Sequence, residues 1–164
     1  MLFADDTKIW RQVSKYNDYL KLQEDINYLL EWSIRNKMKF HPSKCKVLLV
    51  SRFNPPLVGV LPCVQFFYYL GNSFLNYTES EKDLGIFLNR TLNFTEHINY
   101  LYSRANQRFG KLKRTFHFVE SADKIRVFYL TMVRSLFEHC PDVWRPSAES
   151  SINRFESIQK KAIK

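Results

Sequence analysis

The sequence predicts an α+β fold, with a mixed part at residues 1–90 and a helical part at residues 91–164. Short apolar runs bounded by turn residues surround one amphipathic pattern in the first part, which is typical of a few strands and a helix. In the second part the apolar residues recur at helical spacing. The 14 Phe and nine Tyr can bury a core, and only four Gly argue against an all-β protein rich in tight turns.

The first part begins with a predicted pair of short strands and a helix. MLF is apolar, ADDT is typical of a turn, and KIWRQV alternates as a strand does. A helix is expected at residues 18–37, capped by Asn17 or Asp18. Its apolar face consists of Leu22, Ile26, Leu29 and Leu30.

Further strands are expected before residue 90. CKVLLVS follows the proline-marked turn HPSK and predicts a strand. FFYYLGNSFL predicts a hairpin that turns at Gly71-Asn72. EKDLGIFL predicts a short strand pair or a strand end, with Gly85 where the chain turns tightly.

The second part predicts three helices. The first begins after Asn93 with Thr95 as its cap, the second begins near Ser121 and is stopped by Pro141, and the third begins near Ser147. Their inward-facing residues are expected to be Ile98, Leu101, Tyr102, Ala105, Phe109, Leu112 and Phe116; Ile125, Phe128, Tyr129, Met132 and Leu136; and Ile152, Phe155, Ile158 and Ala162.

The charge of the chain favours a polyanionic partner, nucleic acid before membrane. The sequence has 25 basic and 16 acidic residues, a formal charge of +9. Six basic residues and no acidic one fall between Arg35 and Arg52. Four more share a face of the first helix of the second part, opposite its apolar stripe: Arg104, Arg108, Lys111 and Arg114. Such a face can follow a phosphate backbone, and the alternative is an ordinary solvated surface.

The cysteines and the hydropathy indicate an intracellular protein that is not secreted. The three cysteines are far apart, so they indicate neither a zinc site nor a disulfide framework. The apolar start is interrupted by Lys8 and Arg11, which argues against a secretory signal. The most apolar stretch, PLVGVLPCVQFFYYLG, contains Pro62 and Gln65 and is too short to span a bilayer.

Asp5 and Asp6 are the candidate metal ligands. Adjacent residues of a strand point to opposite faces, so both carboxylates can serve one site only in a turn. Held together they repel each other unless a cation lies between them, and Mg²⁺ prefers carboxylate oxygen. The alternative is turn chemistry alone, since Asp often bonds to its own backbone in turns.

Four segments, taken in order, carry a family resemblance. FADDT resembles the third conserved block of the reverse-transcriptase palm, and LQEDINYLLEWSIRNKMKFHPSKCKVLLVSR resembles the next palm block of non-LTR (LINE-type) retrotransposon enzymes. KDLGIFLNRTLNFTEHINYLYSRANQRFGKLKR resembles the primer grip and the start of the thumb. YLTMVRSLFEHCPDVWRP with INRFESIQKKAIK resembles the helical region that follows. His41, where Asn is commoner, and EHCPDVW depart from the family pattern.

The resemblance implies a partial polymerase palm, a short antiparallel sheet with a helix, followed by a helical thumb bundle. Asp5 would bind the catalytic Mg²⁺ and Asp6 would support it, while Phe3 would lie near the primer end. Lys44 would protonate the leaving pyrophosphate, with Lys46 as the alternative. The primer-grip hairpin would contain Leu84, Gly85 and Ile86.

The activity implied is RNA-directed DNA synthesis, a nucleotidyl transfer with an RNA template and a DNA primer as partners. It implies no membrane and no small-molecule cofactor beyond nucleotide and metal. The other metal-binding aspartate of the family lies in an earlier block, and no residue precedes Met1 in this sequence. We therefore expect weak Mg²⁺ binding and no polymerase activity from these residues by themselves. The alternative is a non-catalytic basic domain, derived from such an element, that binds nucleic acid or a protein partner.

Overall fold

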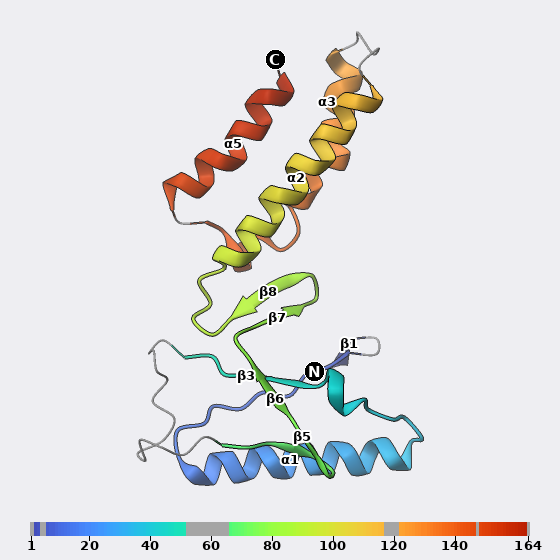
Figure 1. The fold of residues 1–164 in the computed structure, drawn as a ribbon, viewed down its shortest axis with the longest axis vertical. Coiled ribbons are helices and arrows are strands. Elements are labelled where there is room, and N and C mark those ends of the chain that lie inside the picture. The colour runs from blue at the N-terminus through green and yellow to red at the C-terminus, as the bar shows by residue number, and fades with distance from the viewer. Residues whose placement is uncertain (1, 4–5, 52–65, 117–121, 147, 164) are drawn as a thin grey trace. The chain divides into compact units, whose positions relative to one another are not determined.

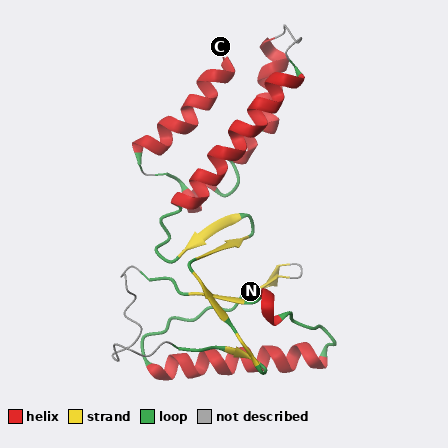
Figure 2. Ribbon diagram, in the orientation of Figure 1, coloured by secondary structure: helices red, strands yellow, loops and turns green. Residues whose placement is uncertain are grey.

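A computed structural model describes residues 2–3, 6–51, 66–116, 122–146 and 148–163. The chain forms two compact units, Met1–Glu81 and Lys82–Lys164. The elements in chain order (Figures 1 and 2) are β1 (Leu2–Phe3), β2 (Asp6–Thr7), α1 (Tyr16–Arg35), the 3-10 turn η1 (Pro42–Lys44), β3 (Lys46–Leu48), β4 (Tyr69–Leu70), β5 (Ser73–Phe74), β6 (Asn76–Thr78), β7 (Ser80–Asp83), β8 (Ile86–Asn89), α2 (Thr95–Thr115), α3 (Ala122–Met132), the 3-10 turn η2 (Arg134–Leu136), α4 (Pro141–Trp144) and α5 (Glu149–Ile163).

The mixed α+β character expected from the sequence is confirmed, and the two parts differ in content as expected. The division between the units falls inside β7, however, and not near residue 90. The reason is that β8 packs on α2, so that Ile86 shares a buried cluster with Ile98 and Leu101. No helix among the described residues is both long and apolar enough to cross a membrane.

Helix α1 begins two residues earlier than expected, and its capping differs. Lys15 is the residue before the helix, so neither Asn17 nor Asp18 is the cap. Asp18 lies in the first turn, where its carboxylate accepts hydrogen bonds from the backbone N–H groups of Ser14 (3.1 Å) and Lys15 (3.0 Å). These hydrogen bonds lower the pKa of Asp18. The acidic side chain thus satisfies backbone donors that precede the helix.

The strands form two-stranded pairs, and one of them is parallel. β1 pairs with β2 and β4 with β5 in antiparallel fashion, whereas β3 pairs with β6 in parallel. The expectation of an antiparallel sheet is therefore wrong for β3. A parallel pair needs a long connection, and 27 residues of the sequence separate β3 from β6. The expected strand KIWRQV is also wrong, since residues 8–14 have no regular secondary structure.

The hairpin at Gly71-Asn72 is confirmed, and it helps to form the core of the first unit. Gly71 has a φ of +61°, which glycine adopts without the steric cost that a Cβ brings. Residues 66–70 alternate between buried and exposed, as a half-covered strand should. The buried residues of this core are Ile26, Phe66, Tyr68, Leu70 and Leu75, with Leu22 and Leu30 of α1 packed against them.

Helix α2 follows its predicted apolar stripe, and its predicted cap is wrong. The buried residues Ile98, Leu101, Ala105, Phe109 and Leu112 all belong to the stripe. Phe94, not Thr95, precedes the helix, with a φ of +53° and no side-chain cap bond of its own. The Asn93 amide oxygen instead accepts a hydrogen bond from the Thr95 backbone N–H at 3.1 Å.

The second predicted helix ends earlier than its pattern suggests. α3 ends at Met132, whose side chain is 47% exposed, whereas the following Val133 is fully buried. A 3-10 turn then replaces the expected helical continuation. Pro141 does not stop this helix but begins α4, because proline is favoured in the first turn, where its missing N–H is no loss.

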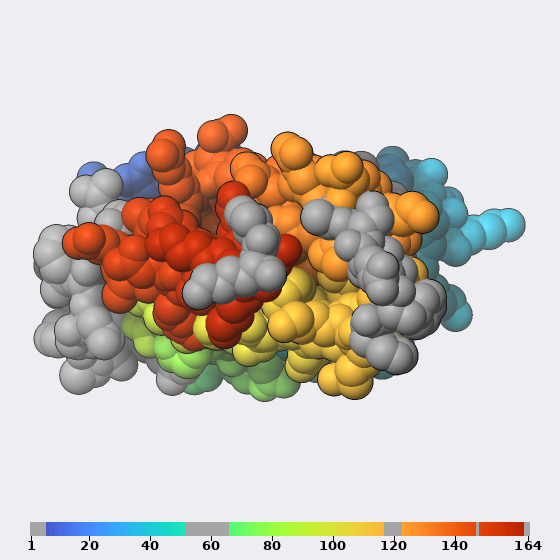
Figure 3. All heavy atoms as spheres, turned by 90° about the horizontal axis from the view of Figure 1, so that it is seen from above, coloured from blue at the N-terminus to red at the C-terminus, as the bar shows by residue number. Residues whose placement is uncertain are grey.

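Helices α2, α3 and α5 bury their apolar faces against one another in the second unit, and Figure 3 shows this unit from above. Trp144 is 3% exposed, and its indole N–H donates to the His139 carbonyl at 2.7 Å. Ile158 of the third predicted stripe is fully buried, whereas Ile152 is 40% exposed. The main cluster is Ala105, Phe109, Leu112, Tyr129, Val133 and Ile158.

Candidate nucleic-acid interface

The carboxylate pair is divided between a strand and residues outside the described part. Asp6 is the first residue of β2, exposed and opposite Phe3 in the strand register, so it is not a turn residue as expected. Asp5, with residue 4, lies outside the described residues. No group of three His, Cys, Asp or Glu side chains that could hold a metal ion occurs among the described residues.

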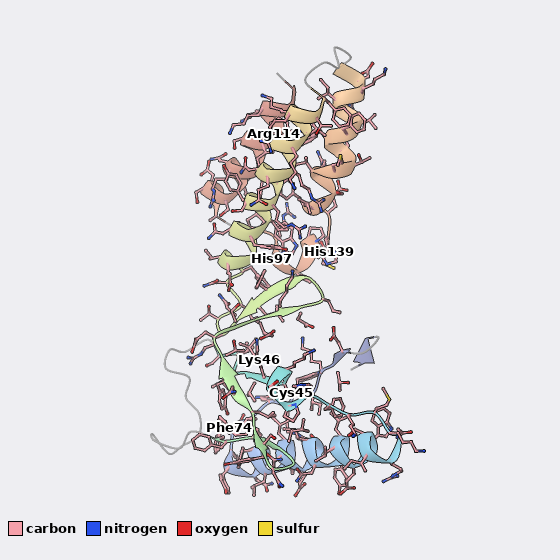
Figure 4. The ribbon with its side chains drawn as sticks, turned by 45° about the vertical axis from the view of Figure 1, so that its right-hand side comes forward. Cys45, Lys46, Phe74, His97, Arg114 and His139 are labelled. Carbon is pink, nitrogen blue, oxygen red and sulfur yellow. The ribbon has the colours of Figure 1, made fainter. Side chains whose placement is uncertain are left out.

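The structure distinguishes the two candidate lysines. The Lys46 ammonium forms an ion pair with Glu81 at 2.8 Å (Figure 4 labels Lys46). Lys44 is the last residue of η1 and is exposed, and its ammonium has no hydrogen bond or ion pair within the described part of the chain. Of the two, Lys44 therefore has the ammonium available to a ligand.

The turn between β7 and β8 has two residues with positive φ. Gly85 has a φ of +93°, and Leu84 has a φ of +47°, where a bulky side chain is strained. Both are exposed, whereas Ile86 is buried against Ile98. The His139 ring holds this turn, because its Nε2 lies 3.1 Å from the Leu84 carbonyl and a Cβ at Gly85 would approach it to 3.3 Å.

The basic face of α2 is present, and its four residues differ in their exposure and in the hydrogen bonds that they form. Arg108 is half-buried, and its guanidinium donates to the Met132 carbonyl at 2.9 Å, so it ties α2 to the end of α3. Lys111 and Arg114 are exposed (Figure 4 labels Arg114). Arg104 is exposed and donates to the Tyr100 hydroxyl at 2.8 Å.

No pattern in the sequence indicated Lys82 or Tyr100 as a binding residue. Lys82 of β7 donates to the Tyr100 hydroxyl at 3.3 Å, and its ammonium lies 4.9 Å from the Tyr100 ring centroid. Hydrogen bonds from Arg104 and then Lys82 lower the pKa of Tyr100. The spacing of Tyr100 and Arg104, one helical turn apart, was a signal of their contact. Nothing local in the sequence indicated that Lys82 would join them.

A buried histidine lies where β8 meets α2. His97 is 1% exposed, and its Nδ1 accepts a hydrogen bond from the Phe87 backbone N–H at 3.4 Å. Its Nε2 has no partner among the described residues. Burial first, and then the neighbouring His139 and Lys82, lower the pKa of His97. Figure 4 shows His97 and His139 beside the β7–β8 hairpin.

The positive charge is concentrated in the second unit. The sequence from Lys82 to Lys164 contains 15 basic and 8 acidic residues, whereas the sequence from Met1 to Glu81 contains 10 basic and 8 acidic residues.

Comparisons with protein-family models, curated proteins and solved structures gave no match for this chain.

Proposed function

We propose that the chain is the C-terminal palm and thumb segment of a non-LTR retrotransposon reverse transcriptase, and that its second unit binds an RNA–DNA duplex along α2. The basic face of α2 carries this proposal. One side of the helix is buried by its apolar stripe, and the other presents Arg104, Lys111 and Arg114 to solvent. A helix arranged in this way can pack on its unit while its cations contact phosphates.

The order of elements supports the polymerase part of the proposal. The paired strands β1 and β2 precede α1, a strand follows η1, and the β7–β8 hairpin leads into a helical unit. This order agrees with the order of the conserved blocks that the sequence resembles. The exposed Lys44 ammonium agrees with a role in proton donation to pyrophosphate.

The residues present fit a magnesium ion only in part. The carboxylate of Asp6 is exposed and is the kind of ligand that Mg²⁺ prefers. In the family reaction, a primer 3′ hydroxyl attacks the α-phosphate of a deoxynucleotide and pyrophosphate leaves. When bound, magnesium stabilises the developing negative charge. In this chain Asp5 and Asp6 would hold the ion, and Lys44 would give its ammonium proton to a pyrophosphate oxygen.

The binding proposal is tested by the salt dependence of duplex affinity. Contacts from the three cations Arg104, Lys111 and Arg114 to phosphates predict a slope of log K against log salt of about −2.7, which is a loss of roughly 40-fold between 50 and 200 mM salt. Fluorescence anisotropy of a labelled RNA–DNA duplex measures it. An affinity that stays constant with salt would contradict the proposal.

Matched variants locate the interface. The double variant Lys111→Gln with Arg114→Gln removes two exposed cations from α2, so the slope should become less steep by about 1.8. The control, Lys124→Gln with Arg126→Gln, removes the same charge from α3. Equal slopes for the two double variants would place binding elsewhere.

A non-catalytic basic domain is the second candidate, favoured by the excess of basic over acidic residues in the second unit, 15 against 8, which needs no catalytic site. Magnesium titration followed by NMR separates the two. The enzyme fragment predicts that the Asp6 amide shifts at millimolar Mg²⁺ and that Asp5→Asn with Asp6→Asn abolishes the shift. The non-catalytic domain predicts no larger shift at Asp6 than at the exposed Asp142.

The 164-residue polypeptide should not extend a primer, and robust incorporation of nucleotides would overturn that expectation.

A further inference from the structure

We propose that Lys82, Tyr100 and Arg104 form a binding site for a single phosphate group of a nucleic-acid backbone, where β7 meets α2. The inference rests on the proposed function, and it names the contact that anchors the strand. Lys82 and Tyr100 are outside the basic face of α2 that the sequence identifies, so they extend the interface onto β7.

Two cations share one neutral acceptor in this cluster. The Tyr100 hydroxyl accepts from the Arg104 guanidinium at 2.8 Å and from the Lys82 ammonium at 3.3 Å. Neither cation forms an ion pair with a carboxylate in the described part of the chain. An uncharged hydroxyl leaves both positive charges uncompensated, whereas an anion would accept hydrogen bonds from the two donors and also balance their charge. An anion would therefore satisfy this cluster better than the hydroxyl does.

Aromatic rings hold both cations in place. The Lys82 ammonium lies 4.9 Å from the ring centroid of Tyr100 and 5.4 Å from that of Phe87. The Arg104 guanidinium lies 5.5 Å from the Tyr100 ring. The two rings meet edge to face, with centroids 5.1 Å apart. Cations fixed in this way lose less conformational entropy on binding than free surface side chains do.

A phosphate group matches the donors that the cluster offers. The guanidinium can donate two parallel hydrogen bonds to phosphate oxygens, and the ammonium supplies a point charge beside it. Once an anion accepts from both cations, the Tyr100 hydroxyl is released to donate its own proton. The 15 basic and 8 acidic residues of this unit favour a polyanion over a lone anion as the source of that phosphate.

The test follows the Tyr100 hydroxyl directly. A bound phosphate draws Arg104 and Lys82 away and neutralises their charge, so the pKa of Tyr100 should rise towards its ordinary value. NMR of ¹³Cζ-labelled tyrosine measures this pKa, with Tyr100→Phe to assign the signal. A DNA duplex is the probe, because RNA hydrolyses at the alkaline pH required. Inorganic phosphate and polyglutamate are the comparison probes.

Affinity measurements with matched variants complete the test. Lys82→Gln and Arg104→Gln should each weaken duplex binding about fivefold, and Tyr100→Phe about threefold. The control is Lys113→Gln, since Lys113 also lies over an aromatic ring of α2, 5.6 Å from the Phe109 centroid, but outside the cluster. The control should bind as the unaltered chain does. Trp144 fluorescence, measured with Trp10 and Trp32 replaced by Phe, checks that the second unit of each variant is folded.

The outcomes are distinct. A rise in the Tyr100 pKa with the duplex but not with polyglutamate supports the site, and an equal rise with both overturns it in favour of an acidic protein. If Lys111 and Arg114 govern the salt slope while Tyr100 does not respond, the proposed function stands and this site fails. If inorganic phosphate shifts Tyr100 and no duplex binds, the proposed function fails and the site takes free phosphate instead.

Discussion

Replacing Ile158 with alanine should destabilise the second unit by about 3–4 kcal/mol. Ile158 is fully buried in the cluster formed by α2, α3 and α5. The substitution removes three carbon groups, worth roughly 2.4 kcal/mol at about 0.8 kcal/mol each. The cavity left in a packed core adds about 1 kcal/mol or more. The full effect requires the α5 face to be as tightly enclosed as the structure shows.

Ile152→Ala is the matched control on the same helix. Its side chain is 40% exposed, so the same substitution removes less buried surface and encloses no cavity. The expected loss is therefore no more than about 1.4 kcal/mol. The two variants differ in position along α5 and not in chemistry.

Urea unfolding followed by Trp144 fluorescence is the assay. Trp144 belongs to the second unit, so Trp10 and Trp32, which belong to the first, are replaced by Phe in every protein compared. The free energy of unfolding then reports on the helical unit. Equal losses for Ile158→Ala and Ile152→Ala, or a loss below about 1 kcal/mol at Ile158, would refute the packing of α5 described here.

Three further predictions concern backbone strain and pH. Leu84→Asn should stabilise the protein by about 1 kcal/mol in thermal unfolding, because Asn tolerates the φ of +47° better than Leu does; a lower melting temperature would contradict this. His97 is buried and its pKa is lowered, so its contribution to stability is complete above pH 6.5 and is lost as the pH falls below that value. The urea midpoints at pH 7.5 and 5.0 should therefore differ less in His97→Asn than in the unaltered chain. An unchanged difference would contradict this role of His97 in the pH dependence of stability. The pKa of Asp18 is lowered in the folded protein, so the ionised Asp18 carboxylate stabilises α1 above pH 3.8. This stabilisation is lost as the pH falls through the pKa of Asp18 in the folded protein. Asp18→Asn should reduce the helical circular dichroism signal at pH 7 but not at pH 2, and a loss of equal size at both would exclude a charge effect.

The sequence by itself determined the features that depend on nearby residues. The stripe from Ile98 to Leu112 fixed the buried face of α2, because residues three and four apart share one side of any helix. Gly71 located the β4–β5 turn, since glycine adopts a positive φ at little cost. The basic face of α2 followed from the same periodicity.

Only the tertiary structure decided what depends on distant partners. Met132 follows Phe128, and Val133 follows Tyr129, by one helical turn, so helical spacing alone could not decide between them. The packing of the unit buries Val133 and leaves Met132 47% exposed. The parallel pairing of β3 with β6 depends on a long connection that no local pattern encodes. Lys82 joins Tyr100 because β7 and α2 meet in space. Local periodicity specifies the faces of an element, whereas the partner of each face is set by the packing of the whole unit.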